Sequence, residues 1–215
     1  MSASVFLAGD DVLRKVDPRR AMLVIPCSAA KARGGQPPGP GAGSGVPQPL
    51  RAARAQVLAA VPADARQVLP AWRRYQGAFY RGAGPAVASA AAAGKVVIIS
   101  GGYGVARADE LIGWYDKVLR LTDWPSGMLE SVLISQARQA GPQAVVAFAA
   151  RTSCYARLVR RTPWQDIGIT TFLVSISGVS SGAMSEVPRR LGLAFAAFWN
   201  QRGTYPPGTT AEQLS

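Results

Sequence analysis

The run Lys95–Ile99 constrains the fold of this chain more than any other segment. It is apolar and β-branched after its first residue, it follows an Ala-rich stretch that ends at Gly94, and it leads directly into the glycine-rich turn Ser100–Gly104. A continuous apolar run, in contrast to an alternating one, is typical of a strand that is covered on both faces. We therefore expect a sheet that lies between two layers of helices.

Three further apolar runs have the same character, at Met22–Ile25, Gln143–Ala150 and Ile167–Ser175. Segments of helical composition separate or follow these runs. They are Leu50–Val61, Val68–Tyr80, Pro85–Ala93, Pro125–Ala140, Thr152–Arg161 and Ser185–Arg202. Strands that alternate with helices favour a parallel sheet. The sequence therefore predicts an α/β fold in a single domain, with a mainly parallel central sheet flanked by helices.

Composition suggests how this domain is bounded. A chain of 215 residues that is 48% hydrophobic is long enough to bury one substantial core. Residues 1–20 are rich in charge and are expected to be an N-terminal extension, and residues 204–215 are expected to be a polar tail. The domain then spans 21–203. Within it, segment 34–49 consists mostly of Gly, Pro, Ser, Ala and Gln, which predicts a flexible loop.

The chain is strongly basic. Lys and Arg total 24 against 12 Asp and Glu, which gives a formal net charge of +12. A positive field of this kind attracts polyanions and speeds their encounter with the protein, so nucleic acid is a candidate partner. The alternative is that the arginines occupy ordinary solvated helix faces and that the excess charge is incidental.

The absence of histidine narrows the chemistry. Histidine is the usual general base near neutral pH and the commonest metal ligand. The two cysteines, Cys27 and Cys154, lie far apart in no metal-ligand pattern. We therefore expect no metal, no cofactor and no disulfide framework, and a reducing cytoplasm as the location. No signal-peptide pattern or bilayer-spanning run is visible, so no membrane association is expected.

Three segments with polar or reactive side chains follow predicted strands: Cys27–Lys31, Ser100–Gly104 and Ala150–Tyr155. In parallel α/β sheets, ligands bind beyond the carboxyl ends of the strands. The glycines of the second segment would let the backbone approach a ligand closely and expose N–H groups to an anion. The alternative is a tight turn from strand to loop, with Tyr103 packed in the core.

Four side chains are candidates for catalysis. Lys31 would bind phosphate or, if desolvated, act as a nucleophile or base. Cys27 is a possible nucleophile that no histidine can activate, and the alternative is a small buried hydrophobe. Glu110 and Asp116 are the best acid–base candidates in a chain without histidine. The alternative for these two carboxylates is ion pairing on a surface.

Two other segments have the composition of binding sites. The segment Tyr75–Arg81 places aromatic rings beside arginine, which suits base stacking and phosphate contact, although an ordinary interface between helix and sheet would have the same composition. In Arg151–Tyr155, the hydroxyls would either cap the following helix or bind an anion at its N-terminus.

Taken in order, these motifs resemble the YaaA family of peroxide-stress proteins. Pro26–Lys31 occupies the place of the family's Ser/Pro/Lys segment, and Gly77–Gly82 matches its Gly-x-x-Tyr-x-Gly pattern. Ser100–Gly104 matches its Ser-Gly-x-Tyr-Gly pattern, and the expected Arg, Leu and Tyr follow at Arg107, Leu111 and Tyr115. Arg151–Tyr155 and Gly182–Met184 resemble later family motifs, so the resemblance extends from Leu23 to Trp199. The Cys-Ser-x-x-Lys version also resembles the accessory domain of archaeal enzymes that build deazaguanine bases in tRNA.

The resemblance implies a YaaA-like α/β fold, DNA binding and a role in limiting oxidative DNA damage. The protein would act on, or protect, a damaged or modified base, and its enzyme class would be glycosylase, lyase or transferase. One departure is that Ser177–Gly182 replaces the basic segment of the family. A biosynthetic enzyme for a small molecule or nucleoside, using the same strand-end pocket, is therefore the alternative.

The predicted site has three groups of residues. The catalytic candidates are Lys31, Cys27, Glu110 and Asp116. The substrate-binding candidates are Ser28, Tyr75, Tyr80, Ser100, Gly101, Tyr103, Gly104, Arg107, Tyr115 and Ser153. The nucleic-acid-binding candidates, expected to hold phosphate, are Lys31, Arg81, Arg107 and Arg151.

Overall fold

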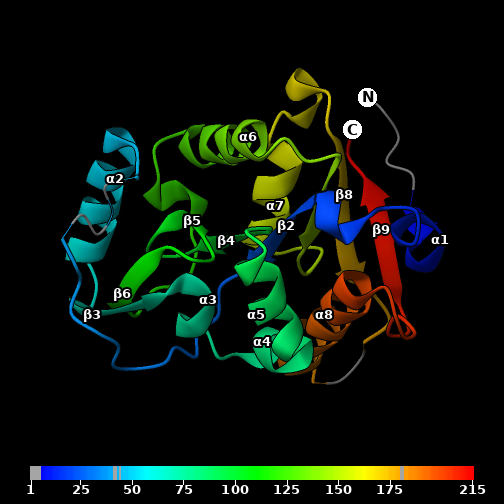
Figure 1. The fold of residues 1–215 in the computed structure, drawn as a ribbon, viewed down its shortest axis with the longest axis horizontal. Coiled ribbons are helices and arrows are strands. Elements are labelled where there is room, and N and C mark those ends of the chain that lie inside the picture. Colours follow the sequence, from blue (N-terminus) through cyan, green and yellow to red (C-terminus); the bar gives the residue numbers. More distant parts are fainter. Residues whose placement is uncertain (1–5, 41–42, 44, 180–181) are drawn as a thin grey trace.

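The apolar runs predicted from the sequence form neighbouring parallel strands at the centre of the main sheet (Figure 1). The structure is a computed structural model that describes residues 6–40, 43, 45–179 and 182–215. Within these residues, the strand order across the main sheet is β1-β9-β8-β7-β2-β4-β5. The strands are β1 Phe6–Ala8, β2 Ala21–Pro26, β4 Val96–Ser100, β5 Gly104–Arg107, β7 Ala144–Phe148, β8 Thr170–Ile176 and β9 Thr209–Gln213.

The prediction of an α/β fold with a parallel centre is confirmed, but the edges of the sheet are antiparallel. Strand β5 pairs antiparallel with β4 at one edge, and β9 and β1 complete the other edge in antiparallel pairing. The prediction of a polar tail over 204–215 is wrong for Thr209–Gln213, which pair with β8. The reason is visible in Glu212, which is buried and forms a 2.7 Å ion pair with Arg160. In the N-terminal segment, Phe6–Ala8 likewise join the sheet.

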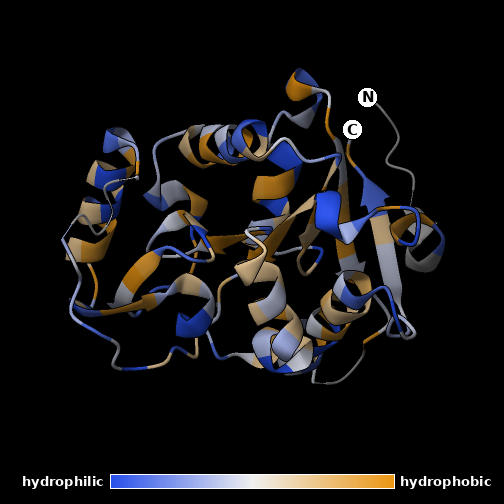
Figure 2. Ribbon diagram, viewed as in Figure 1, coloured by the Kyte–Doolittle hydropathy of each residue, from blue (hydrophilic) through white to orange (hydrophobic). Residues whose placement is uncertain are grey.

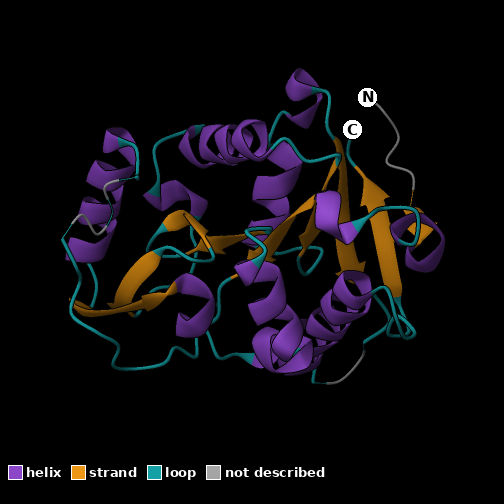
Figure 3. Cartoon of the chain, viewed as in Figure 1, coloured by secondary structure: helices purple, strands orange, loops and turns teal. Residues whose placement is uncertain are grey.

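Helices cover both faces of the sheet, as the continuous apolar strands require (Figure 3). The α-helices are α1 Gly9–Leu13, α2 Gln48–Ala59, α3 Ala71–Arg74, α4 Ala78–Ala83, α5 Pro85–Ala92, α6 Met128–Ala140, α7 Cys154–Arg161 and α8 Ala183–Asn200. Three short 3-10 helices are η1 Pro18–Arg20, η2 Leu121–Asp123 and η3 Trp164–Ile167. Most of the predicted helices are present within a few residues of their expected bounds.

Alternate residues of each central strand enter two different cores. In β2, Leu23 and Ile25 face a core that α4, α5 and α8 complete, whereas Met22 and Val24 face a core that α2, α6 and α7 complete. Figure 2 shows the strands at the centre as mostly apolar. Burial on both faces accounts for the absence of polar alternation in the sequence.

A small second sheet replaces part of a predicted helix. Residues Val68–Tyr80 were expected to be helical, but β3 (Ala63–Pro70) pairs antiparallel with β6 (Leu111–Tyr115), and only Ala71–Arg74 form a helical turn before Tyr75. Pairing across the two strands overrides the local helical composition. This small sheet lies beside β5, at the end of the molecule opposite β1 and β9 (Figure 1).

Helices α4 and α8 cross in close contact through two glycines. A Cβ atom at Gly82 would collide with the backbone carbonyl of Arg189, and one at Gly192 would collide with that of Phe79. The two backbones therefore touch directly, and the α4–α8 crossing contributes to the layer that supports β2 and β4.

Candidate functional site

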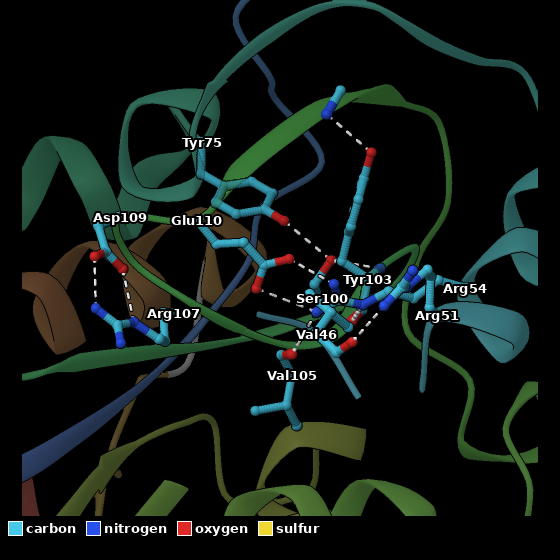
Figure 4. A network of polar contacts seen from close by, with 11 residues as sticks. Val46, Arg51, Arg54, Tyr75, Ser100, Tyr103, Val105, Arg107, Asp109 and Glu110 are labelled. Carbon is cyan, nitrogen blue, oxygen red and sulfur yellow. Dashed lines mark hydrogen bonds and ion pairs between the residues drawn. The ribbon is translucent and has the colours of Figure 1, made fainter. Parts of the chain in front are cut away.

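A group of three hydroxyls lies where β4, β6 and the segment after α3 meet. The Tyr75 hydroxyl donates to Ser100 Oγ at 3.0 Å, and the Tyr115 hydroxyl lies 2.8 Å from Ser100 Oγ and 2.9 Å from the Tyr75 hydroxyl. All three side chains are buried. Figure 4 shows Tyr75 pointing toward Ser100. We call Tyr75, Ser100 and Tyr115 the hydroxyl triad.

The glycine turn after β4 packs against protein. Ser100 Oγ accepts the backbone N–H of Tyr103 at 3.0 Å, which closes the turn. A Cβ atom at Gly102 would lie 2.6 Å from the Tyr115 ring, and one at Gly101 would lie 2.5 Å from the Lys117 carbonyl oxygen. Gly104 has a φ of +67°. These glycines are therefore explained by close packing and backbone conformation, and their geometry favours the tight-turn alternative.

The thiol of Cys27 lies at the end of β2 beside a further tyrosine. Its sulfur is 3.2 Å from the hydroxyl of Tyr155, the second residue of α7. Tyr80 donates to the carbonyl of Pro26 at 3.0 Å, so its ring also packs at this strand end. Cys27 is 7% exposed, which agrees with the expectation of a small buried hydrophobe but leaves the sulfur next to the hydroxyls.

Burial keeps these tyrosines protonated. It raises the pKa of Tyr75, Tyr80, Tyr115 and Tyr155 above the usual tyrosine value, and the neighbouring Cys27 raises each of them further. The cluster therefore offers neutral O–H groups that can donate as well as accept hydrogen bonds at neutral pH.

Lys31 is the cationic residue at this strand end. Its ammonium lies 4.4 Å from the centroid of the Tyr115 ring and 3.4 Å from the Ala29 carbonyl oxygen. A backbone bridge between Lys31 and Tyr75 fixes the segment beside the hydroxyl triad. Burial lowers the pKa of Lys31, and electrostatic interactions with Cys27 and Asp116 partly oppose this shift.

Asp116 comes directly after β6 and is exposed. Its backbone N–H donates to the Pro62 carbonyl at 2.8 Å, which fixes the position of the residue, and its carboxylate acts electrostatically on Lys31. The structure therefore brings Cys27, Lys31 and Asp116 together with the hydroxyl triad at the carboxyl ends of β2 and β4. We call this set the strand-end cluster.

A cavity of about 560 Å³ adjoins the strand-end cluster and shares Tyr75 with it. Its lining includes the rings of Trp72, Tyr75 and Tyr80 and the exposed arginines Arg73 and Arg81. Tyr75 and Tyr80 lie with their ring centroids 5.6 Å apart. We call this the Trp72–Arg81 cavity, and its combination of aromatic faces with guanidinium groups suits a flat aromatic ligand that carries an anion.

Two predicted site residues, Arg107 and Glu110, lie elsewhere. Glu110 accepts two contacts from the guanidinium of Arg54 in α2, at 2.5 and 3.3 Å, with both side chains largely buried. Arg107 pairs with the exposed Asp109 at 2.6 Å (Figure 4). Both predicted residues line a separate cavity of about 930 Å³ between β5, α2 and α6. The Glu110 carboxylate is paired with Arg54, which favours a role in ion pairing over acid–base catalysis.

Arg54 also determines the shape of the glycine turn. It donates to the carbonyl oxygens of Tyr103 and Val105 at 2.8 Å each. The Tyr103 hydroxyl accepts the backbone N–H of Gly113 at 2.8 Å, so Tyr103 joins the turn to β6. Because both ends of Tyr103 are held within the protein, this ring is not free to stack on a base.

The remaining predicted binding residues form hydrogen bonds within the protein. Ser28 Oγ accepts the backbone N–H of Gly77 at 3.0 Å, and Ser153 caps α7 by accepting the Ala156 N–H at 3.2 Å. Arg81 donates to the Gln76 carbonyl and borders the Trp72–Arg81 cavity. Arg151 is exposed, and its carbonyl accepts a hydrogen bond from Arg160.

The most buried arginine, Arg74, was not among the predicted site residues. The guanidinium of Arg74 is fully buried and donates to the carbonyl oxygens of Ala32, Gly34, Gln67 and Ile112, at distances between 2.7 and 3.1 Å. Among the described residues it forms no ion pair. It attaches the segment that follows Lys31 to the small sheet, and only the tertiary structure reveals this role.

Two other residues were missed, and each had a weak signal. Arg54 occupies the apolar face of α2, together with Leu50, Ala53 and Val57, and an arginine at that helical spacing indicates a buried partner. Tyr155 lies in a segment that was singled out for its hydroxyls, but its approach to Cys27 depends on how α7 packs.

Comparison with known proteins places no constraint on the chemistry of this site. No protein-family model matches the chain, and no curated protein has a significantly similar sequence. In the part of the chain that the structure describes, no group of three or more Cys, Asp or Glu side chains has a metal-binding arrangement. Over the same residues, no helix has the length and apolar character needed to cross a bilayer.

Proposed function

We propose that this is a YaaA-like DNA-binding protein that takes one damaged or modified nucleotide into the Trp72–Arg81 cavity and acts on it with the amine of Lys31. The observation that carries this proposal is the position of that amine, half-buried on the Tyr115 ring and next to Cys27. A lysine whose pKa is lowered by burial has more of the neutral, nucleophilic form near pH 7. A role in the response to oxidative stress follows the resemblance to that family.

The shape of the cavity supports a base as the ligand. Trp72, which is partly exposed, offers a stacking surface beside the buried rings of Tyr75 and Tyr80, and the exposed guanidinium groups of Arg73 and Arg81 would contact phosphate. Tyr75 contributes to both the cavity and the hydroxyl triad, so a base stacked there would lie close to the strand-end cluster.

In the proposed reaction, the neutral amine of Lys31 attacks C1′ of the sugar as the bond between C1′ and the base breaks. Asp116 takes the proton that the attacking nitrogen loses and passes it to the departing base, which leaves in its neutral form. The nitrogen lone pair then breaks the bond between C1′ and the ring oxygen, which takes a proton from water, and the resulting iminium ion between Lys31 and C1′ is reduced by borohydride to a stable secondary amine.

The test is borohydride trapping of the protein with an oligonucleotide that contains an 8-oxoguanine or an abasic site, followed by peptide mapping. The expected result is a covalent adduct on Lys31 that is absent in Lys31→Met. Lys95→Met is the matched control, because Lys95 precedes β4 and so lies at the amino ends of the parallel strands, away from the strand-end cluster. It should keep the adduct. An adduct that persists in Lys31→Met, or that forms at random lysines, contradicts the proposal.

The binding step is tested separately by titrating a fluorescent oligonucleotide at several salt concentrations. Arg73→Gln with Arg81→Gln should weaken binding several-fold and reduce its salt dependence, because fewer counterions are released when two phosphate contacts are lost. Binding that is absent in the unaltered protein, or unaffected by salt, rules out a nucleic acid as the ligand.

A second candidate is a nucleoside-type biosynthetic enzyme that uses the same cluster. The size of the cavity favours it, since about 560 Å³ is in the range of small-molecule sites. Here Lys31 or Cys27 would react with a free nucleoside or a similar small molecule. Adducts that form with free nucleosides, but not with oligonucleotides, would select this function, and full activity in both Lys31→Ala and Cys27→Ala would exclude it.

A further inference from the structure

A second arginine-rich surface lies along α8, away from the strand-end cluster. It is a groove of about 950 Å³ that α8 forms with η1 and the segment 202–207. Four arginines line it, and Leu193 and Ala196 contribute apolar surface. These arginines are Arg19, Arg189, Arg190 and Arg202, and we call the surface the α8 groove.

The positive charge of the α8 groove is only partly neutralised. Arg189 and Arg190 share the single carboxylate of Glu186, at 2.8 and 2.7 Å. Among the described residues, no carboxylate lines the groove itself. Asp17, the nearest acid in the sequence to Arg19, is already used to cap η1, where it accepts the backbone N–H of Arg19.

Within the part of the chain that the structure describes, the two remaining arginines form no ion pair. The guanidinium of Arg19 stacks 3.5 Å from the centroid of the Trp199 ring, which holds it in place without neutralising it. Arg202 is exposed beyond the end of α8. Planar guanidinium groups that are held in place, with their N–H donors free, bind phosphate well because they can donate two parallel hydrogen bonds.

The α8 groove and the Trp72–Arg81 cavity belong to the same helical layer. Arg81 lies on α4, and the backbone of α4 touches that of α8 next to Arg189. Figure 1 shows α4, α5 and α8 side by side. The positive surfaces of the two sites are therefore carried by helices in direct contact.

We propose that the α8 groove binds the sugar–phosphate backbone of a nucleic acid strand. This rests on the proposed function for the identity of the polyanion, but it assigns contacts outside the strand-end cluster. Arg19 and Arg202 would neutralise phosphates without reading the base sequence, as backbone contacts do.

The test compares the double variant Arg19→Gln/Arg202→Gln with the control Arg120→Gln/Arg138→Gln. Both remove two exposed arginines, but Arg120 and Arg138 lie outside the α8 groove, in the segment before η2 and in α6. Affinity for a fluorescent single-stranded oligonucleotide is measured across salt concentrations. The groove variant should bind several-fold more weakly, with a salt slope smaller by about 0.7 for each lost phosphate contact, whereas the control should match the unaltered protein.

A single variant, Arg202→Glu, guards against a folding defect because it leaves the contact between Arg19 and Trp199 intact. It should also weaken binding, with an unchanged melting temperature. Equal weakening in the groove variant and the control, or no weakening in either, overturns the proposal. So does a groove variant that loses binding to anionic lipid vesicles while it keeps oligonucleotide affinity.

The failure of this inference is separable from that of the proposed function. Borohydride trapping on Lys31 reports only on the strand-end cluster. If trapping succeeds and the groove variant binds like its control, the α8 groove is not a nucleic-acid surface, and the proposed function stands. If trapping fails and the groove variant still loses affinity, the groove is supported and the chemistry is wrong.

Discussion

Two groups of buried polar side chains meet at the glycine turn after β4, and they differ in the partners that compensate for the loss of water. On one side, Tyr75, Ser100 and Tyr115 form a neutral network in which each hydroxyl contacts the other two. On the other side, Arg54 and Glu110 form an ion pair whose guanidinium also holds two backbone carbonyls of the turn.

This difference indicates that the ion pair serves to stabilise the turn, whereas the neutral network lies beside the group that is free to react. The carboxylate of Glu110 neutralises Arg54, the residue that holds the turn. Lys31 has the opposite situation, because its described contacts are an aromatic ring and a backbone carbonyl, and no ion pair is found for it within the described residues. The side with the complete ion pair is suited to hold the turn, and the side with an unpaired amine is suited to react.

The largest effect is expected from Glu110→Gln, which leaves the charge of Arg54 buried without a carboxylate. Removing one partner of a buried ion pair typically costs about 3–5 kcal/mol of unfolding free energy. Urea denaturation measures the loss. Because the glycine turn depends on Arg54, we also expect weaker borohydride trapping on Lys31.

The matched control is Asp109→Asn, which breaks the exposed ion pair with Arg107, where both side chains are more than half exposed. Exposed pairs contribute less than about 1 kcal/mol. If Asp109→Asn were as destabilising as Glu110→Gln, burial would not account for the contribution of the Arg54–Glu110 ion pair to stability.

An intermediate effect is expected from Tyr115→Phe. The hydroxyls of Tyr75 and Ser100 keep each other as partners, so the loss of one buried hydrogen-bonding group should cost about 1 kcal/mol. The Phe ring still supports the ammonium of Lys31, so the trapping yield should change less than in Lys31→Met. A loss of stability equal to that of Glu110→Gln would mean that the hydroxyl triad, and not the ion pair, holds the turn.

The smallest effect concerns the pH dependence of stability. Burial lowers the folded-state pKa of Lys31 below its ordinary value of 10.5, so between these two values the unfolded chain binds more protons than the folded one. Unfolding free energy therefore rises with pH across that interval, and Lys31→Met should remove this rise. The tyrosines titrate in both proteins, so the difference between the two pH profiles isolates Lys31. Identical profiles would contradict a buried amine.

The centre of the fold could be predicted because its signals are local. Lys95–Ile99 and the other apolar runs carry their own evidence of burial on both faces, and Gly141, in the left-handed conformation after α6, ends that helix where the sequence indicated. The edges could not be predicted in this way. Thr209–Gln213 have no apolar run, and they become a strand only because β8 offers an unpaired edge and Arg160 pairs with Glu212.

The sequence predicted the location of the site better than it predicted the roles of the individual residues. Because β2 and β4 are parallel neighbours, Cys27, Lys31 and Ser100 lie together at the carboxyl ends of the strands, where ligands bind in parallel sheets. The partner of Glu110 lies in a helix more than fifty residues earlier in the chain, and no spacing in the sequence connects the two. Carboxylates near a predicted turn therefore look alike until their counterions are known.

The contact between α4 and α8 also offers a way to recognise distant relatives of this chain. Gly82 and Gly192 each face the backbone of the other helix, so a larger side chain at either position would force the helices apart. Substitution is thus restricted at two positions by geometry alone, whatever the role of the strand-end cluster. A pair of glycines, one in a short helix before the central strand and one in the final helix, is a structural marker that can persist after overall sequence similarity is lost.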